Sequence, residues 1–141
     1  MVSASLAAVV VVVPITSEAD VIQVRQVLRA EAERAGLGLV DQTKLVTAGS
    51  ELARNILTHT SASRGEMRVE AVRSMSRSGV RATFRDEGPG IADLEAAMTD
   101  GFSTKGSLGL GLPGSKRLVD EFSLDSALGK PTIVVIAKWQ R

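Results

Sequence analysis

The feature that most constrains this chain is a pair of glycine clusters about fifteen residues apart. The first cluster follows a carboxylate, in the run DEGPG that begins at Asp86. The second is GSLGLGLPG, residues 106–114, and it leads into a predicted helix at Pro113. Glycine lets backbone N–H groups approach a ligand closely, and such a backbone entering a helix N-terminus favours phosphate. A carboxylate at one end and a phosphate cradle at the other is the layout of a purine nucleotide site.

Composition limits the classes of protein that could carry such a site. The 141 residues predict one globular domain, residues 1–141, because 44% are hydrophobic and 23% charged. The net charge of +1 and only 3% aromatic residues argue against a nucleic-acid partner. The absence of Cys and the presence of one His exclude thiolate zinc sites and multi-histidine metal centres. A cytoplasmic protein is the simplest interpretation.

An apolar run near the start, residues 6–13 (LAAVVVVV), has the length of a strand rather than of a membrane span. No Lys or Arg precedes it, so the basic region of a signal peptide is missing. The β-branched residues predict a buried strand that ends at Pro14. We therefore expect no membrane partner.

Periodicity predicts the remaining elements. A first helix begins at a Thr16 or Ser17 cap and ends at Gly36. Its apolar face repeats at helical spacing through Val21, Val24, Leu28 and Ala32. The elements predicted after it are a helix over 40–60, strands over 67–75 and 80–85, a short helix over 92–98, a loop over 99–108, a helix from Pro113, and strands over 123–127 and 132–139 with a turn at 129–130. This order predicts an α/β fold, a two-layer α+β sandwich whose strands form hairpins rather than βαβ units.

Glu51 and Asn55 in the run ELARN lie four residues apart, so a helix places both on one face. Taken alone, this pair favours ordinary helix surface. The chemical alternative is that Asn55 offers an oxygen to Mg²⁺ while Glu51 orients or deprotonates an attacking hydroxyl. His59, one turn further on, is either a phosphate contact or an exposed residue at the helix end.

Asp86 follows predicted strand residues, where an unpaired buried carboxylate would be costly. It can accept a hydrogen bond from the exocyclic amine of adenine, while Gly88 and Gly90 leave room for the base. The alternative is an ordinary β-turn, since Asp, Gly and Pro all form turns.

The second glycine cluster contains G-x-G-x-x-G at Gly109, Gly111 and Gly114. A polar loop precedes it where the dinucleotide fold requires a strand, which excludes that fold. A Walker A loop also fails, because Ser115 stands where its Lys must be. The remaining interpretation is a glycine-rich lid with polar side chains for triphosphate oxygens, namely Ser103, Thr104 and Lys105.

Together, the motifs ELARN, DEGPG and LGLGLPG resemble the N, G1 and G2 boxes of the GHKL ATPase superfamily. The similarity continues through DGFSTKGSLGLGLPGSKRLVDEF and a last strand ending in KW, and it covers the chain up to Trp139. Within the superfamily the chain resembles the RsbT-like serine/threonine kinases of bacterial stressosome signalling, with the anti-sigma-factor kinases RsbW and SpoIIAB as cousins. The resemblance implies a Bergerat fold, a mostly antiparallel sheet backed by helices.

The resemblance also implies roles for single residues. Asp86 would bind the adenine of ATP, Asn55 would hold Mg²⁺, and Glu51 would act as the catalytic base. Thr132 would lie near adenine on a following strand, although this chain has Gly-Lys-Pro-Thr where the family often has Gly-x-Gly-Thr. The glycines and the lid over 99–108 would contact the nucleotide through Gly88, Gly90, Ser103, Thr104, Lys105, Gly106, Gly109, Leu110 and Gly111.

The activity implied by the resemblance is ATP- and Mg²⁺-dependent phosphorylation of a small STAS-domain protein, an RsbS-like antagonist with RsbR-like scaffolds. The released kinase would then bind and activate an RsbU-like phosphatase, which is a partner switch. The alternative is a nucleotide-gated binding protein, such as an RsbW-like anti-sigma factor that captures a sigma factor. A detached histidine-kinase catalytic domain would need a dimerisation helix, and we expect no room for one.

Overall fold

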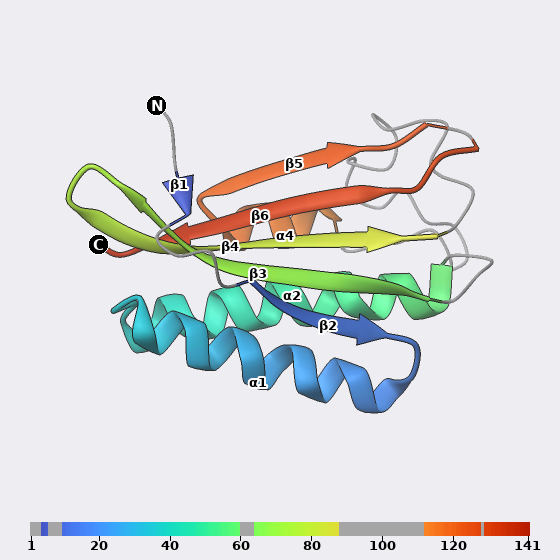
Figure 1. Ribbon diagram of the computed structural model, residues 1–141, viewed down its shortest axis with the longest axis horizontal. Helices are drawn as coiled ribbons and strands as arrows, with labels where there is room; N and C mark the ends of the chain where they lie inside the picture. Colours follow the sequence, from blue (N-terminus) through green and yellow to red (C-terminus); the bar gives the residue numbers. More distant parts are fainter. Residues whose placement is uncertain (1–3, 6–9, 60–63, 88–111, 128) are drawn as a thin grey trace.

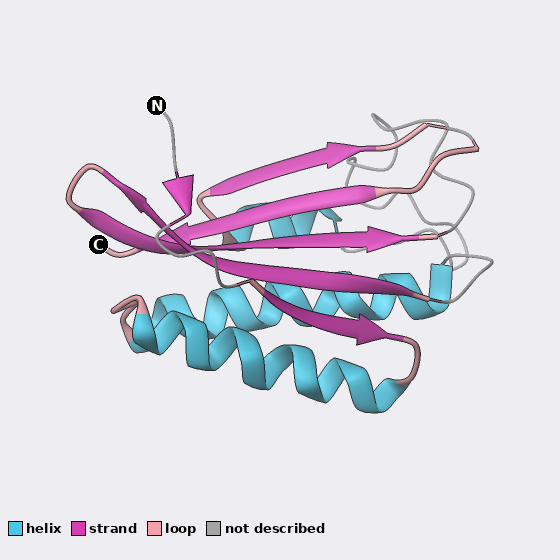
Figure 2. Ribbon diagram, viewed as in Figure 1, coloured by secondary structure: helices cyan, strands magenta, loops and turns pink. Residues whose placement is uncertain are grey.

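The computed structural model describes residues 4–5, 10–59, 64–87, 112–127 and 129–141 of the chain. Three helices lie in this part: α1 (Glu18–Arg34), α2 (Leu39–His59) and α4 (Leu112–Leu118). They cover one face of a sheet, so the described part of the chain has two layers (Figure 1, Figure 2). None of these helices is both long and apolar enough to cross a membrane.

Every strand pairing in the described sheet is antiparallel, as the sequence predicted. The strand order is β1-β3-β4-β6-β5, and β2 also pairs with β3 beside β1. The long central hairpin is formed by β3 (Gly65–Ser74) and β4 (Arg77–Asp86). The other strands are β1 (Ala4–Ser5), β2 (Val11–Ile15), β5 (Glu121–Asp125) and β6 (Ile133–Trp139).

The first strand differs from its predicted extent. Pro14 was expected to end it, but β2 continues through Pro14 to Ile15. Proline is tolerated there because β2 lies at the edge of the sheet and, within the described residues, pairs with β3 alone. The predicted start at residues 6–9 lies outside the described residues, and β1 pairs separately with the far end of β3.

The other described elements match their predicted order, with shifted ends. The last hairpin begins earlier, because β5 spans Glu121–Asp125 instead of 123–127. The predicted turn is present, with Gly129 at a φ of 82° that favours glycine. The helix predicted over 92–98 and the loop over 99–108 lie outside the described residues.

The core lies between the sheet and the helices. Alternate residues of the central strands, such as Met67, Val69 and Phe84, are buried against the helices. The predicted apolar face of α1 is also confirmed as buried. The two long helices approach closely at Gly49, where an added Cβ would lie 2.2 Å from Leu28 Cδ1. This close packing fixes α2, which carries Glu51 and Asn55, against α1.

A buried lysine holds the other end of α2. Lys138 on β6 is only 3% exposed, and its Nζ donates to the carbonyl oxygen of Leu118 at 3.0 Å. The same Nζ lies 3.5 Å from Asp41 Oδ1 and 3.7 Å from Asp120 Oδ1. Burial raises the pKa of Asp120, but the backbone N–H of Trp139 and neighbouring cations outweigh it, so this pKa is lowered overall. The cluster connects the start of α2, the end of α4 and β6.

Candidate nucleotide site

The site begins where β4 ends, at Asp86. Its side chain is on the helix side of the sheet and is only 9% exposed. The last pairing between β4 and β6 joins Arg85 to Ile133, and one step beyond it Asp86 faces Thr132. The backbone N–H of Thr132 donates to Asp86 Oδ1 at 3.3 Å, and the N–H of Asp86 donates to the Thr132 carbonyl at 3.1 Å. Two residues 46 positions apart, both candidates from the sequence, are thus in direct contact.

Thr132 is 8% exposed, and its hydroxyl lies 2.7 Å from the hydroxyl of Ser126. Pro131, where this chain departs from the family pattern, has no backbone N–H of its own. The contact with Asp86 is made by the N–H of the next residue, Thr132, and is therefore unaffected. Ser126 was not among the sequence candidates, since an isolated Ser carries no signal. In the structure its hydroxyl shares a hydrogen bond with the hydroxyl of Thr132.

The carboxylate of Asp86 has the chemistry that an adenine amine requires. An ionised carboxyl group accepts several hydrogen bonds, and the N–H of Thr132 accounts for one of them. A buried carboxylate also favours further donors, because burial without them is costly. The acceptor oxygens of Asp86 at the end of β4 therefore fit a ligand with an exocyclic amine.

The second part of the site lies on α2. Glu51 is exposed and Asn55 is partly buried, one helical turn further towards the end of the helix. The chain leaves α2 and enters β3 at Gly65, which pairs directly with Asp86. The last turns of α2 and the end of β4 therefore lie at the same end of the molecule (Figure 1). The fold therefore brings the Glu51 carboxylate, the Asn55 amide and Asp86, the candidate for base binding, to one end of the molecule.

The described chain resumes in α4. The helix begins at Leu112, directly after the second glycine cluster, and packs on α2. Leu112 is 2% exposed, so the chain that leaves the cluster is fixed in the core. Pro113 lies in the first turn of α4, as predicted.

Several candidates lie outside the described residues: Gly88, Gly90, Ser103, Thr104, Lys105, Gly106, Gly109, Leu110 and Gly111. His59 is the last residue of α2, but its side chain is also outside the described part. Their contacts with a nucleotide stay predictions.

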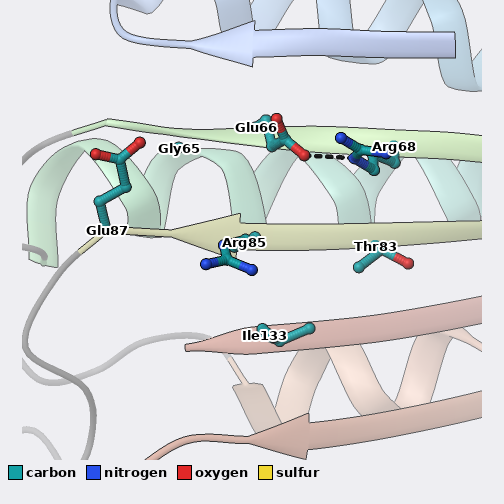
Figure 3. Close-up of a pocket in the computed structure, with 7 residues that line it drawn as sticks. All are labelled: Gly65, Glu66, Arg68, Thr83, Arg85, Glu87 and Ile133. Atoms are coloured by element: carbon teal, nitrogen blue, oxygen red, sulfur yellow. Dashed lines mark hydrogen bonds and ion pairs between the residues drawn. The ribbon is translucent and has the colours of Figure 1, made fainter. Parts of the chain in front are cut away.

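A shallow hollow next to the site is not part of it. Figure 3 shows side chains of β3, β4 and β6 around this hollow, on the face of the sheet away from the helices. Thr83 and Arg85 line it and alternate along β4 with Phe84 and Asp86, whose side chains are buried on the helix side. The carboxylate of Asp86 therefore opens onto the other face.

The candidate metal ligand is a single amide. Among the described residues, no group of three or more His, Cys, Asp or Glu side chains gathers to hold a metal. Mg²⁺ is commonly held by one or two protein oxygens together with substrate phosphates and water. Asn55, partly buried and one turn from Glu51, fits that mode of binding.

The fold and this arrangement define a class of protein. Residues 14–139 match the family model of the histidine kinase-like ATPase domain, and this range contains β3 to β6, the three described helices and both parts of the site. The chain therefore belongs to this ATPase family, and membership implies ATP binding.

Comparison with individual proteins shows which members of this family the chain resembles. It is 46% identical over 129 residues to the serine/threonine-protein kinase RsbT of Bacillus subtilis (strain 168), covering 92% of this chain and 96% of that protein. It is 32% identical over 99 residues to the anti-sigma F factors of Bacillus licheniformis and Bacillus subtilis (strain 168), covering 68% of each chain. Within the ATPase family, this chain is an RsbT-like serine/threonine kinase.

Proposed function

We propose that the protein transfers the γ-phosphoryl group of ATP to a serine hydroxyl on a small STAS-domain protein, with Mg²⁺ as the metal. The observation that carries this proposal is the contact between Asp86 and Thr132 at the same end of the fold as Glu51 and Asn55. In this proposal Asp86 would bind the base and Glu51 would act as general base on the same nucleotide. The kinase relative covers nearly the whole chain, which supports the same chemistry.

Each described residue has one task in this proposal. Asp86 accepts a hydrogen bond from the adenine amine, and the backbone N–H of Thr132 holds the Asp86 carboxylate in position. Asn55 would hold Mg²⁺, which when bound neutralises charge on the phosphate oxygens. Glu51 is exposed, so an acceptor hydroxyl from another protein can reach it. The candidates between 88 and 111 would surround the phosphates.

In the transfer step, a bond forms between the serine oxygen and the γ-phosphorus. The bond between that phosphorus and the oxygen bridging it to the β-phosphate breaks, and ADP leaves. The serine proton passes to the carboxylate of Glu51 and from there to solvent, because Glu51 is exposed. The described residues thus bind the base, orient the acceptor and accept its proton.

The partners proposed for this kinase are those that its resemblance to the RsbT-like kinases implies. The substrate would be an RsbS-like antagonist on RsbR-like scaffolds, and phosphorylation would release the kinase to activate an RsbU-like phosphatase in the cytoplasm. This role places the protein in a stressosome-type partner switch.

A second candidate function is supported by the similarity to anti-sigma F factors. In that case the main output would be nucleotide-dependent capture of a sigma factor, with phosphoryl transfer secondary. The presence of both Glu51 and Asn55 favours catalysis, since an inactive module is expected to lack one of them.

The experiment that tests the proposal is transfer from γ-labelled ATP and Mg²⁺ to a panel of purified STAS-domain proteins. Label on a STAS serine, lost in Asn55→Ala, would support the kinase and identify its substrate. Nucleotide binding without any label would contradict it and favour the binding protein.

A further inference from the structure

Three polar side chains form a row across β4, β6 and β5, which lie side by side in that order (Figure 1). The register of β4 and β6, continued one step beyond the strand pairing, places Asp86 opposite Thr132. The register of β5 and β6, continued one step beyond the pair of Asp125 and Ile133, places Ser126 opposite Thr132 on its other side. Thr132 therefore lies between the carboxylate of Asp86 and the hydroxyl of Ser126.

This row faces the helices. The row before it consists of apolar side chains that belong to the hydrophobic core or pack against it, namely Phe84, Val134 and Leu124. Side chains two positions apart on a strand share a face, so the polar row continues the same side of the sheet. Asp86 and Thr132 are buried, and Ser126 is partly buried. The first polar row after the core thus lies at the candidate base-binding end.

The two hydroxyl groups of the row form a hydrogen bond. Ser126 Oγ and Thr132 Oγ1 are 2.7 Å apart, the usual distance for such a bond. Each hydroxyl has a single proton, so one group donates and the other accepts. Ser126 is the contact of the Thr132 hydroxyl within the described residues. If Ser126 donates, the Thr132 proton is available to a ligand; if Thr132 donates, only its lone pairs are.

The neighbouring carboxylate indicates which of these two directions suits an adenine base. Ionised Asp86 can only accept hydrogen bonds, and its Oδ1 accepts one from the Thr132 N–H. The edge of adenine that carries the amine also carries N1, a ring nitrogen that accepts. Side chains opposite each other in antiparallel strands have Cβ atoms about 4.5–5.5 Å apart, so one base can reach both residues. A donor at Thr132 matches N1, whereas a second acceptor would not.

We propose that Ser126 is a positioning residue for base recognition. Its hydroxyl donates to Thr132 Oγ1 and so directs the Thr132 proton towards N1 of adenine, beside the amine held by Asp86. Ser126 itself does not touch the base. Guanine and hypoxanthine carry a carbonyl in place of the amine and an N–H in place of N1, so the row opposes both. The inference rests on the ATP site of the proposed function, but it does not require phosphoryl transfer.

The test compares two serines of the β5 hairpin. Ser126→Ala removes the hydroxyl of the row, whereas Ser123→Ala removes an exposed hydroxyl on the opposite face of β5 and is the matched control. Calorimetry with Mg²⁺ gives the Kd of each variant for ATP and for 1-deazaadenosine triphosphate, which keeps the amine but has C–H in place of N1. Ser126→Thr, which keeps a hydroxyl, is measured beside them.

We expect Ser126→Ala to raise the Kd for ATP about three- to tenfold and to leave the Kd for the deaza analogue nearly unchanged. The reason is that only ATP offers an acceptor to the Thr132 proton. Ser126→Thr and Ser123→Ala should keep the wild-type ratio of the two Kd values. Thr132→Val should lose the preference for ATP, and adding Ser126→Ala to it should change the ratio no further, because Ser126 acts through that hydroxyl.

The ratio of the two Kd values decides the question, because partial unfolding of a variant would affect both values alike. An equal rise for both nucleotides in Ser126→Ala, or a ratio equal to that of Ser123→Ala, would overturn the inference. A wild type that binds both nucleotides equally, or neither, would overturn it as well. Loss of the ATP preference in Ser126→Ala, without transfer from wild type to any STAS-domain protein, would support the inference and contradict the proposed kinase function.

Discussion

The replacement Asp86→Asn tests how the base is held, because the structure dictates which way the new amide must point. The N–H of Thr132 needs an acceptor, and Asp86 Oδ1 supplies it at 3.3 Å. An amide at position 86 would turn its oxygen towards that N–H. Its NH₂ group would then face the adenine amine. Two hydrogen-bond donors would meet there, whereas in the wild type the adenine amine donates to a carboxylate oxygen.

The expected magnitude follows from that mismatch. A hydrogen bond to a charged group contributes about 1.5–3 kcal/mol, and about 1.4 kcal/mol corresponds to a tenfold change in affinity. The Kd for ATP should therefore rise roughly 10- to 150-fold in Asp86→Asn. The fold should persist, since the two side chains have nearly the same size and the contact with Thr132 is kept.

The assay is calorimetric titration with ATP and with inosine triphosphate, which carries a carbonyl in place of the amine. Asp86→Asn should lose affinity for ATP while gaining relative affinity for inosine triphosphate, because its NH₂ can donate to that carbonyl. Asp125→Asn, at the exposed end of β5, is the matched control and should bind ATP normally. An unchanged Kd for ATP in Asp86→Asn would refute the assignment of Asp86 to adenine.

Three further predictions concern catalysis and stability. Glu51→Ala should retain ATP affinity but lose about 10²- to 10⁴-fold in transfer rate, as expected for a general base; full activity in a single-turnover assay would remove Glu51 from this role. Gly49→Ala should destabilise the fold by about 1–3 kcal/mol in urea unfolding, because its Cβ would lie 2.2 Å from a buried Leu28 methyl group, whereas Gly38→Ala has open space and should change little. The backbone N–H of Thr16 donates to Asp20 and lowers the pKa of this carboxyl group below its ordinary value of 3.8. Ionised Asp20 should therefore stabilise the fold above pH about 3.8, and this stabilisation should be lost as the pH falls through the lowered pKa of the folded state. The difference in melting temperature between wild type and Asp20→Asn should therefore shrink in acid, and a constant difference would contradict that linkage.

The sequence predicted the layers of the fold because the periodicities of its helices and strands are clear. It missed the course of β2 because Pro14 ordinarily ends a strand, and only tertiary pairing shows that this strand lies at an edge. It placed β5 two residues late, since the buried face of β5 consists of only Phe122 and Leu124, both partly exposed. Local patterns fix the type of an element better than its ends.

The site was predictable to a similar degree. Family motifs named Asp86 and Thr132, but the two hydrogen bonds between them depend on the register of β4 and β6, which no local pattern encodes.

The measurement that tests the account most directly is a crystal structure with a non-hydrolysable ATP analogue and Mg²⁺. The account predicts the adenine amine within hydrogen-bond distance of the Asp86 carboxylate, and Mg²⁺ about 2.1 Å from the Asn55 amide oxygen. It also predicts the γ-phosphate close to the side of α2 that carries Glu51. A nucleotide bound with its base away from Asp86, or a metal held without Asn55, would contradict the account.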